Sequence, residues 1–215
     1  MPKKSYEERK AAWAAKQKAK QDAAPTLAER STDRLPPGQH LTTGFPVLDL
    51  GIKPKIPTAE WSLELTGCVE NPTTLGWEAL NALPQSSDIS DFHCVTTWSK
   101  FDCEWSGVAF TELLDLVRPT EAASHVLYTA YDGYTTNTPL ETLYDSDVLL
   151  ATSFEGKPIT TEHGGPARVI IPKLYAWKGA KFVRKIEFLA EDQLGYWEKR
   201  GYSNTADPWL EDRFS

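Results

Sequence analysis

The chain has 215 residues, which suffices for one well-filled domain, and 40% of them are hydrophobic and available for a core. Its net charge is -7, yet residues 1–30 carry eight Lys or Arg against four Asp or Glu, so the remainder carries a net −11. Because binding to a phosphate backbone needs clustered cations, this acidic body argues against nucleic acid as a partner.

The sequence also bears on the cellular compartment. No apolar run approaches the roughly 18 residues that a membrane span requires. The N-terminus has neither an apolar core nor a twin-arginine pair, so it does not resemble a secretory signal. Three cysteines, an odd number, do not make a disulfide framework. We therefore expect a soluble, cytoplasmic protein.

The first quarter of the chain falls into two parts. Residues 3–24 are rich in Ala, Lys and Gln and predict a helix that only Tyr6 and Trp13 can anchor. We expect residues 1–30 to form a peripheral N-terminal helix and residues 31–215 to form the functional domain. Prolines and glycines between positions 25 and 57 exclude a regular helix or central strand there. The apolar residues of that stretch predict an extended arm that packs on the domain: Phe45, Val47, Leu48 and Leu50.

The rest of the chain alternates between short apolar runs and turns. The apolar spacing predicts two short helices, over 75–83 and 110–117. Residues 154–159 predict a hairpin through Glu-Gly-Lys-Pro. Strands are predicted over 61–67, 92–98, 126–130, 148–152, 168–171 and 182–189. Many short strands with few short helices indicate an α+β fold with mixed β-sheets and not a doubly wound parallel sheet.

Cys94 lies in the most informative segment, Asp-Phe-His-Cys-Val-Thr-Thr-Trp-Ser over 91–99. Taken alone, a cysteine in an apolar strand is usually a small buried hydrophobe. A zinc site with His93 and Cys103 fails on ligand spacing. A thiol nucleophile would need His163 or His125 as its base, because His93 would point to the opposite face of a strand.

The segments that follow give Cys94 its context. The run over 93–99, Trp-Ser-Gly-Val over 105–108 and Phe-Thr-Glu-Leu-Leu over 110–114 together resemble the molybdopterin-binding domain of the sulfite oxidase family. The likeness is greatest to short, stand-alone prokaryotic members. It implies a sulfite-oxidase-type fold, a molybdenum–molybdopterin cofactor and Cys94 as the metal's thiolate ligand. A soft thiolate suits a metal that a pterin dithiolene already holds. Cys68 and Cys103 lack this context, and we assign them no such role.

Tyr134 closes an Asp-Gly-Tyr run that also fits the resemblance. In the family segment that it resembles, a tyrosine lies beside the metal, and a phenol there can donate or accept a proton. The alternative is a turn that carries a packed aromatic residue.

Two further runs resemble the parts of the family that hold the pterin. His-Gly-Gly-Pro-Ala-Arg over 163–168 implies that His163 and Arg168 contact the pterin and its phosphate, which Arg can bind through two parallel hydrogen bonds. In Trp-Lys-Gly-Ala-Lys over 177–181, the amides of Gly179 and Ala180 with the Lys181 ammonium would form an anion-binding nest. The alternative is a turn before a strand, with Arg168 in solvent. The aromatic C-terminal segments, 195–202 and 207–213, are interpreted as structural.

The chain differs from the family in two features: the residues that would bind the substrate and the groups that would transfer electrons. Family members that oxidise sulfite place an arginine where residues 45–50 have none. His40, just upstream, is a candidate cofactor contact or an ordinary loop histidine; Arg168 or Lys100 could supply positive charge. A haem-attachment motif is missing, and three cysteines cannot ligate a four-cysteine iron–sulfur cluster. The small-molecule substrate therefore stays open, and electrons require a separate transfer partner.

The sequence thus predicts a molybdopterin-dependent oxidoreductase that transfers oxygen atoms at a molybdenum ligated by Cys94. The alternative is a cofactor-free binding module that retains the fold.

Overall fold

The structure is a computed structural model that describes residues 5–12, 15 and 34–215. Of the predicted N-terminal helix, residues 6–12 are helical, and Trp13 lies outside the described residues. Tyr6 anchors this helix: its side chain is buried and its hydroxyl donates to the Asp115 carboxylate at 2.8 Å. None of the helices in the described ranges has the length and apolar character needed to cross a bilayer.

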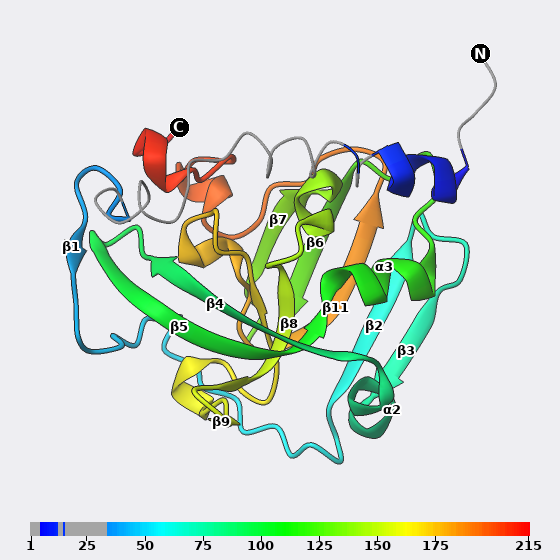
Figure 1. Cartoon of the computed structure of the whole chain (residues 1–215), viewed down its shortest axis with the longest axis horizontal. Helices are drawn as coiled ribbons and strands as arrows, with labels where there is room; N and C mark the ends of the chain where they lie inside the picture. Colours follow the sequence, from blue (N-terminus) through cyan, green and yellow to red (C-terminus); the bar gives the residue numbers. More distant parts are fainter. Residues whose placement is uncertain (1–4, 13–14, 16–33) are drawn as a thin grey trace.

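One sheet is built around the long strand β5 (Figure 1). β5 pairs antiparallel with β4 and β8 and parallel with β1, and the sheet runs in the order β1-β5-β8-β10, with β9 on β8. β8 and β9 form the predicted hairpin. The strands of this sheet are β1 (His40–Leu41), β4 (Gln85–His93), β5 (Trp98–Ala109), β8 (Leu149–Phe154), β9 (Lys157–Pro158) and β10 (Arg168–Ile170).

The second sheet has the order β3-β2-β11-β6-β7 and mixes parallel and antiparallel pairs. Its central strand, β11, runs parallel to β2 and antiparallel to β6. Val183, Ile186 and Phe188 of β11 are fully buried, as a central strand requires. The strands are β2 (Ser62–Gly67), β3 (Thr73–Gly76), β6 (His125–Ala130), β7 (Thr135–Pro139) and β11 (Val183–Leu189).

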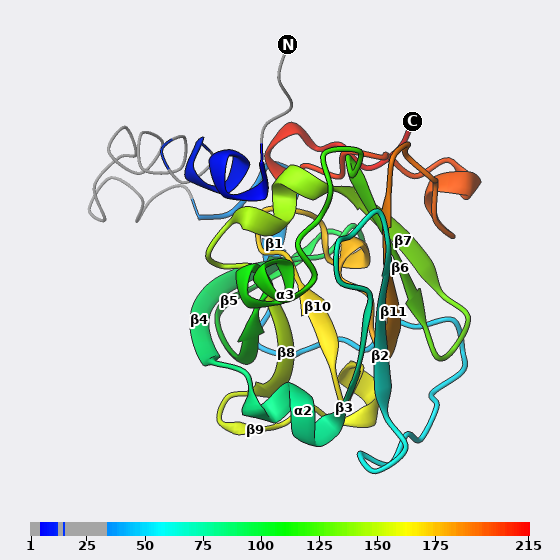
Figure 2. The same cartoon turned by 90° about the vertical axis from the view of Figure 1, so that its right-hand side faces the viewer.

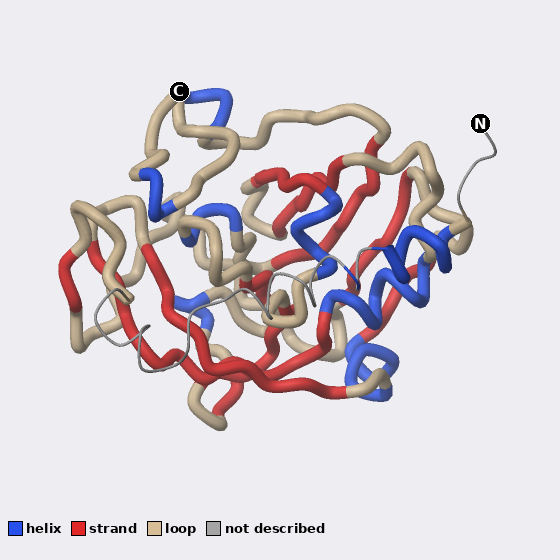
Figure 3. Tube along the Cα trace, turned by 45° about the horizontal axis from the view of Figure 1, so that its top comes forward, coloured by secondary structure: helices blue, strands red, loops and turns tan. Residues whose placement is uncertain are grey.

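The helices are short and lie between and around the sheets (Figure 3). α3 (Phe110–Val117) is the predicted amphipathic helix, and it buries Phe110, Leu113, Leu114 and Val117, which share one face at helical spacing. The others are α2 (Trp77–Ala82) and the 3₁₀ turns η2 (Leu140–Tyr144), η3 (Thr161–His163), η4 (Ala176–Lys178), η5 (Glu198–Arg200) and η6 (Pro208–Leu210). The predicted α+β fold with mixed sheets and short helices is confirmed.

Figure 2 separates the two sheets, with β4, β5, β8 and β9 on one side and β2, β6, β7 and β11 on the other. The main hydrophobic core joins α3 to both sheets. A smaller core lies against β4 and β5 and contains Phe92, Cys94, Trp98, Cys103 and Trp105. The two cores fix the strand ends from which the site residues project.

One predicted strand is wrong in a way that matters for the site. Residues 92–98 are not one strand: β4 ends at His93, β5 begins at Trp98, and Cys94 opens the turn between them. The Cys94 amide donates to the Trp98 carbonyl at 2.9 Å, and the Thr97 amide donates to the Cys94 carbonyl at 3.1 Å. Thr97 takes a φ of 74°, which reverses the chain within a run of strand-forming residues.

Other boundaries also differ from the prediction. The helix expected over 75–83 begins only at Trp77, because Leu75 belongs to strand β3. β1, β3 and β7 were not predicted as strands, nor were most of β4 and most of β5. In β5 the buried Cys103 and Trp105 alternate with exposed charged residues, which is the pattern of a half-buried strand, so the sequence did carry a signal for this strand.

Candidate active site

A cavity of about 370 Å³ lies where six separate segments meet. Its walls come from the arm over 45–50, the turn that carries Cys94, the 132–134 turn, the 163–168 run, the 176–181 segment and the 197–202 segment. Tertiary structure therefore brings together residues up to about 150 positions apart in the chain. The lining is mainly aromatic and apolar, with a few convergent polar groups, as is typical of small-molecule sites.

Cys94 lies on the cavity wall, 5% exposed, with its sulfur 3.1 Å from Thr96 Oγ1. Two distant side chains hold the backbone of its turn: Gln39 Nε2 donates to the Cys94 carbonyl at 3.1 Å, and Arg213 Nη1 donates to the Val95 carbonyl at 2.5 Å. Burial raises the pKa of the Cys94 thiol, while the Thr96 hydrogen bond opposes the shift. A buried thiol with a raised pKa is a poor free nucleophile, and it becomes a strong ligand only once a metal displaces its proton.

Arg168 lines the cavity, and its side chain is buried, with 2% of the residue exposed. Its Nη1 donates to the His163 carbonyl at 2.9 Å, and its guanidinium lies 5.3 Å from the Phe92 ring centroid and 5.4 Å from that of Trp105. Its Nε has no hydrogen-bond partner among the described residues. Burial lowers the pKa of Arg168 to about 10. The arginine thus carries a buried charge that lacks a carboxylate partner there.

Lys181 and His163 extend this positive end of the cavity. Lys181 Nζ donates to the carbonyls of Leu48, at 2.8 Å, and Glu162, at 2.7 Å, so it ties the arm to η3. The His163 ring stacks on Phe45 at 4.1 Å between centroids. Burial and repulsion from Arg168 lower the pKa of Lys181 to about 8. The pKa of His163 is also lowered, by burial and by repulsion from Lys181. Groups whose positive charges repel each other in this way favour a bound anion.

Tyr134 lines the cavity with its ring, and its hydroxyl donates to the Trp177 carbonyl at 2.6 Å. Its amide donates to Asp132 Oδ1 at 3.0 Å, which closes the turn before β7. Burial raises the pKa of the Tyr134 phenol well above its usual range. The phenol proton is therefore committed to the protein backbone in this structure.

The remaining predicted residues divide between the cavity wall and other places. Gly179 lines the cavity, and a Cβ at this position would collide with the Val169 carbonyl. Ala180 is fully buried beside it, and its carbonyl accepts from the Val169 amide at 2.9 Å. His40 is exposed on β1. Within the described residues, neither Ala180 nor His40 is among those that line the cavity.

Several aromatic residues on the cavity wall were not predicted as site residues, and three of them come from the last 40 residues of the chain: Trp177, Trp197 and Tyr202. We call these three the aromatic wall. The Tyr202 ring lies 5.4 Å from Trp177 and 4.9 Å from Trp197, centroid to centroid. The Tyr202 hydroxyl has no hydrogen bond to another residue that the structure describes. The density of aromatic residues in an otherwise charged C-terminal segment was the available signal.

Comparison with known proteins identifies the family of this chain. The profile of the family described as "Oxidoreductase molybdopterin binding domain" matches residues 50–197. The "Uncharacterized oxidoreductase YuiH" of Bacillus subtilis is 40% identical, over 88% of this chain and 96% of that protein. The "Protein-methionine-sulfoxide reductase catalytic subunit MsrP" of Campylobacter jejuni is 28% identical over 66% of this chain, and the chain matches only 53% of that relative.

A solved structure, the sulfane dehydrogenase SoxCD from Paracoccus pantotrophus, shares the fold. It superposes with a TM-score of 0.61 at 19% identity, over 69% of this chain and 42% of that one. The chain therefore belongs to the oxidoreductase family with a molybdopterin-binding domain and is a molybdenum-dependent oxidoreductase of the sulfite-oxidase-like type.

Proposed function

We propose that this chain holds molybdenum–molybdopterin in the cavity, with the Cys94 thiolate as the protein's ligand to the metal, and catalyses oxygen-atom transfer. The observation that carries the proposal is the buried Cys94 thiol on the same cavity wall as Arg168 and Lys181. A soft ligand and a cationic anion site in one cavity match the two ends of such a cofactor.

The residues present fit the group. Arg168 Nε lacks an acceptor among the described residues, and repulsion from Arg168 adds to burial in lowering the pKa of Lys181, against the opposing carboxylates of Asp49 and Asp132 on the same cavity wall. A phosphate would supply both the acceptor and the charge. At Gly179 the backbone packs so closely on Val169 that a Cβ would collide with the Val169 carbonyl, so this part of the cavity wall requires glycine.

When bound, such a centre supplies two-electron redox chemistry with transfer of an oxygen atom. Cys94 would fix the metal, and the raised pKa of its thiol means that the proton leaves on metal binding. Arg168 and Lys181 would hold the phosphate, with His163 stacked beside them on Phe45. Of the two tyrosines on the cavity wall, Tyr134 donates its phenol proton to the Trp177 carbonyl, so Tyr202 would be the one that exchanges a proton with substrate.

The aromatic wall also favours a class of substrate. The cationic side chains on the cavity wall are Arg168 and Lys181. Trp177, Trp197 and Tyr202 instead present aromatic rings, which make favourable contacts with sulfur. Lys100, which could have served an anionic substrate, instead pairs with Glu155 at 3.8 Å. Together with the methionine-sulfoxide reductases among the relatives, this supports a neutral sulfoxide over sulfite as substrate. Turnover of methionine sulfoxide and of sulfite, compared on the same preparation, tests the choice.

Electrons would come from a separate partner, in a cytoplasmic compartment that suits three free cysteines. The second candidate, a binding module that has lost its cofactor, is weakened because Cys94, Arg168 and Lys181 all remain at one cavity.

The test is the metal and pterin content of protein purified from a host that makes the cofactor. We expect near-stoichiometric molybdenum and pterin fluorescence on denaturation, with the molybdenum lost in Cys94→Ser. Cys103→Ser is the matched control, because Cys103 is equally buried in the same small core and is not among the cavity-lining residues described. Wild-type protein without molybdenum or pterin would contradict the proposal.

A further inference from the structure

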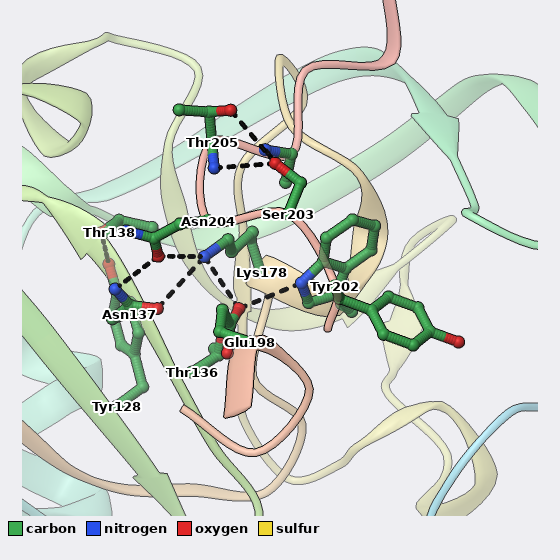
Figure 4. Close-up of polar contacts among 12 residues, drawn as sticks. Tyr128, Thr136, Asn137, Thr138, Lys178, Glu198, Tyr202, Ser203, Asn204 and Thr205 are labelled. Carbon is green, nitrogen blue, oxygen red and sulfur yellow. Dashed lines mark hydrogen bonds and ion pairs between the residues drawn. The ribbon is translucent and has the colours of Figure 1, made fainter. Parts of the chain in front are cut away.

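A buried ion pair lies behind the aromatic wall (Figure 4). Lys178 Nζ and Glu198 Oε1 are 2.8 Å apart, and each side chain is 1% exposed. Lys178 belongs to η4, between the cavity residues Trp177 and Gly179, and Glu198 begins η5, directly after Trp197. The pair therefore joins the two segments that carry the wall without lining the cavity itself.

The Glu198 carboxylate is bound directly to the wall. Its Oε1 accepts from the indole Nε1 of Trp177 at 3.0 Å and from Thr136 Oγ1 at 3.0 Å, in addition to Lys178 (Figure 4). Trp177 in turn packs edge-on against Tyr202. One carboxylate oxygen thus fixes the orientation of an indole on the wall relative to strand β7.

The Lys178 ammonium completes the link to the C-terminal segment. Besides Glu198, it donates to Asn137 Oδ1 at 3.1 Å and to Asn204 Oδ1 at 3.4 Å. Asp192 then accepts from the side-chain amides of both asparagines, at 2.5 Å and 2.6 Å. The three protons of the ammonium have three acceptors, one each on η5, β7 and the segment that follows Tyr202.

Such a pair is a weak source of stability. Burial lowers the pKa of Lys178, and the neighbouring Glu198 opposes the shift, so desolvation offsets much of the attraction. Apolar residues could fill the same space about as stably, but they could not orient the Trp177 indole by a hydrogen bond. The contacts therefore point to geometry as what the pair provides.

We propose that the Lys178–Glu198 pair is a positioning device that sets the aromatic wall and so controls how long the cavity retains its pterin. Neither residue is among the described residues that line the cavity, so both act through Trp177, Trp197 and Tyr202. The inference rests on the proposed function, because it takes the pterin as the occupant of the cavity.

The test is the rate of pterin release from wild-type, Glu198→Gln and Thr136→Val proteins, each measured well below its unfolding temperature. Glu198→Gln keeps an acceptor for Trp177 but removes the charge that holds Lys178, so we expect release about tenfold faster. Thr136→Val removes one donor to Glu198 and is mild enough to fold, and we expect an increase of about threefold.

Leu113→Ala separates positioning from stability. Leu113 is fully buried on α3 and is not a cavity residue, so this variant lowers the unfolding temperature without changing the wall. Faster release in Glu198→Gln and Thr136→Val with wild-type release in Leu113→Ala supports the proposal. Wild-type release in the first two, or equal acceleration in all three, overturns it.

The cofactor-free protein gives a second readout that does not depend on the proposed function. In protein labelled with 5-fluorotryptophan, the ¹⁹F resonance of Trp177, assigned by its loss in Trp177→Phe, should shift or broaden in Glu198→Gln and keep its wild-type position in Leu113→Ala. An unchanged resonance would overturn the positioning role. Wild-type protein that never contains pterin would instead refute the proposed function, and the resonance would still decide whether the pair orients the wall.

Discussion

Replacing Arg168 by methionine should act in opposite directions on the cofactor-free and the loaded protein. Burial lowers the pKa of Arg168 from its usual value to about 10, which corresponds to about 3 kcal/mol of cost for keeping its charge inside the fold. Methionine removes that cost. It also removes the hydrogen bond to the His163 carbonyl and the contacts with two aromatic rings, which together contribute about 3 kcal/mol.

The two contributions nearly cancel in the cofactor-free protein. We therefore expect Arg168→Met to change its free energy of unfolding by no more than about 1 kcal/mol, measured by urea denaturation. In the loaded protein the same change removes a charged contact to phosphate and should weaken pterin retention by about 10- to 100-fold. The half-buried Arg118, which pairs with Glu7 and Glu70 and is not among the described residues that line the cavity, is the control, and Arg118→Met should leave pterin retention unchanged. Strong destabilisation of the cofactor-free protein, or unchanged pterin retention, would refute the reasoning.

Three further predictions concern individual groups of the cavity. Because burial lowers the pKa of Lys181 to about 8, its ammonium loses its proton as pH rises through that value. Phosphate binding to the cofactor-free protein, measured by calorimetry, should therefore weaken between pH 7 and 9. Lys181→Met should abolish that pH dependence. Gly179→Ala places a Cβ against a backbone carbonyl and should lower the free energy of unfolding, measured in denaturant, by about 1–3 kcal/mol. Gly76 has open space around it, so Gly76→Ala should lower the free energy of unfolding by less. Tyr134→Phe should lower the free energy of unfolding by about 1 kcal/mol, because it loses a hydrogen bond. Tyr202→Phe should leave the free energy of unfolding unchanged and reduce turnover about tenfold or more. The reverse pattern would contradict the role of the Tyr202 hydroxyl in proton exchange.

The fold class and most elements followed from local patterns. The helix over 110–117 agrees with its prediction because its apolar residues recur at helical spacing. The central strand β11 agrees because its buried apolar residues Ile186 and Phe188 alternate with less buried ones. β7 was missed because Thr-Thr-Asn-Thr-Pro has no apolar alternation; its side chains are buried against other polar groups instead. Such burial depends on partners far along the chain, which a local pattern does not contain.

The cavity could be predicted only where short motifs mark it. Cys94, Arg168 and Lys181 were found through runs that resemble a known family, and the structure brings their side chains to one cavity. Trp197 and Tyr202 were interpreted as structural, because an aromatic residue that packs and one that faces a ligand look the same in sequence. The Lys178–Glu198 pair depends on two residues 20 positions apart that meet only in the folded chain.

The central claim is that the Cys94 sulfur ligates the metal, and X-ray absorption at the molybdenum K-edge tests it most directly. Loaded wild-type and Cys103→Ser proteins should show the same number of sulfur neighbours around molybdenum. Any metal that Cys94→Ser retains should have one sulfur neighbour fewer. An identical sulfur shell in Cys94→Ser and wild-type protein would contradict it.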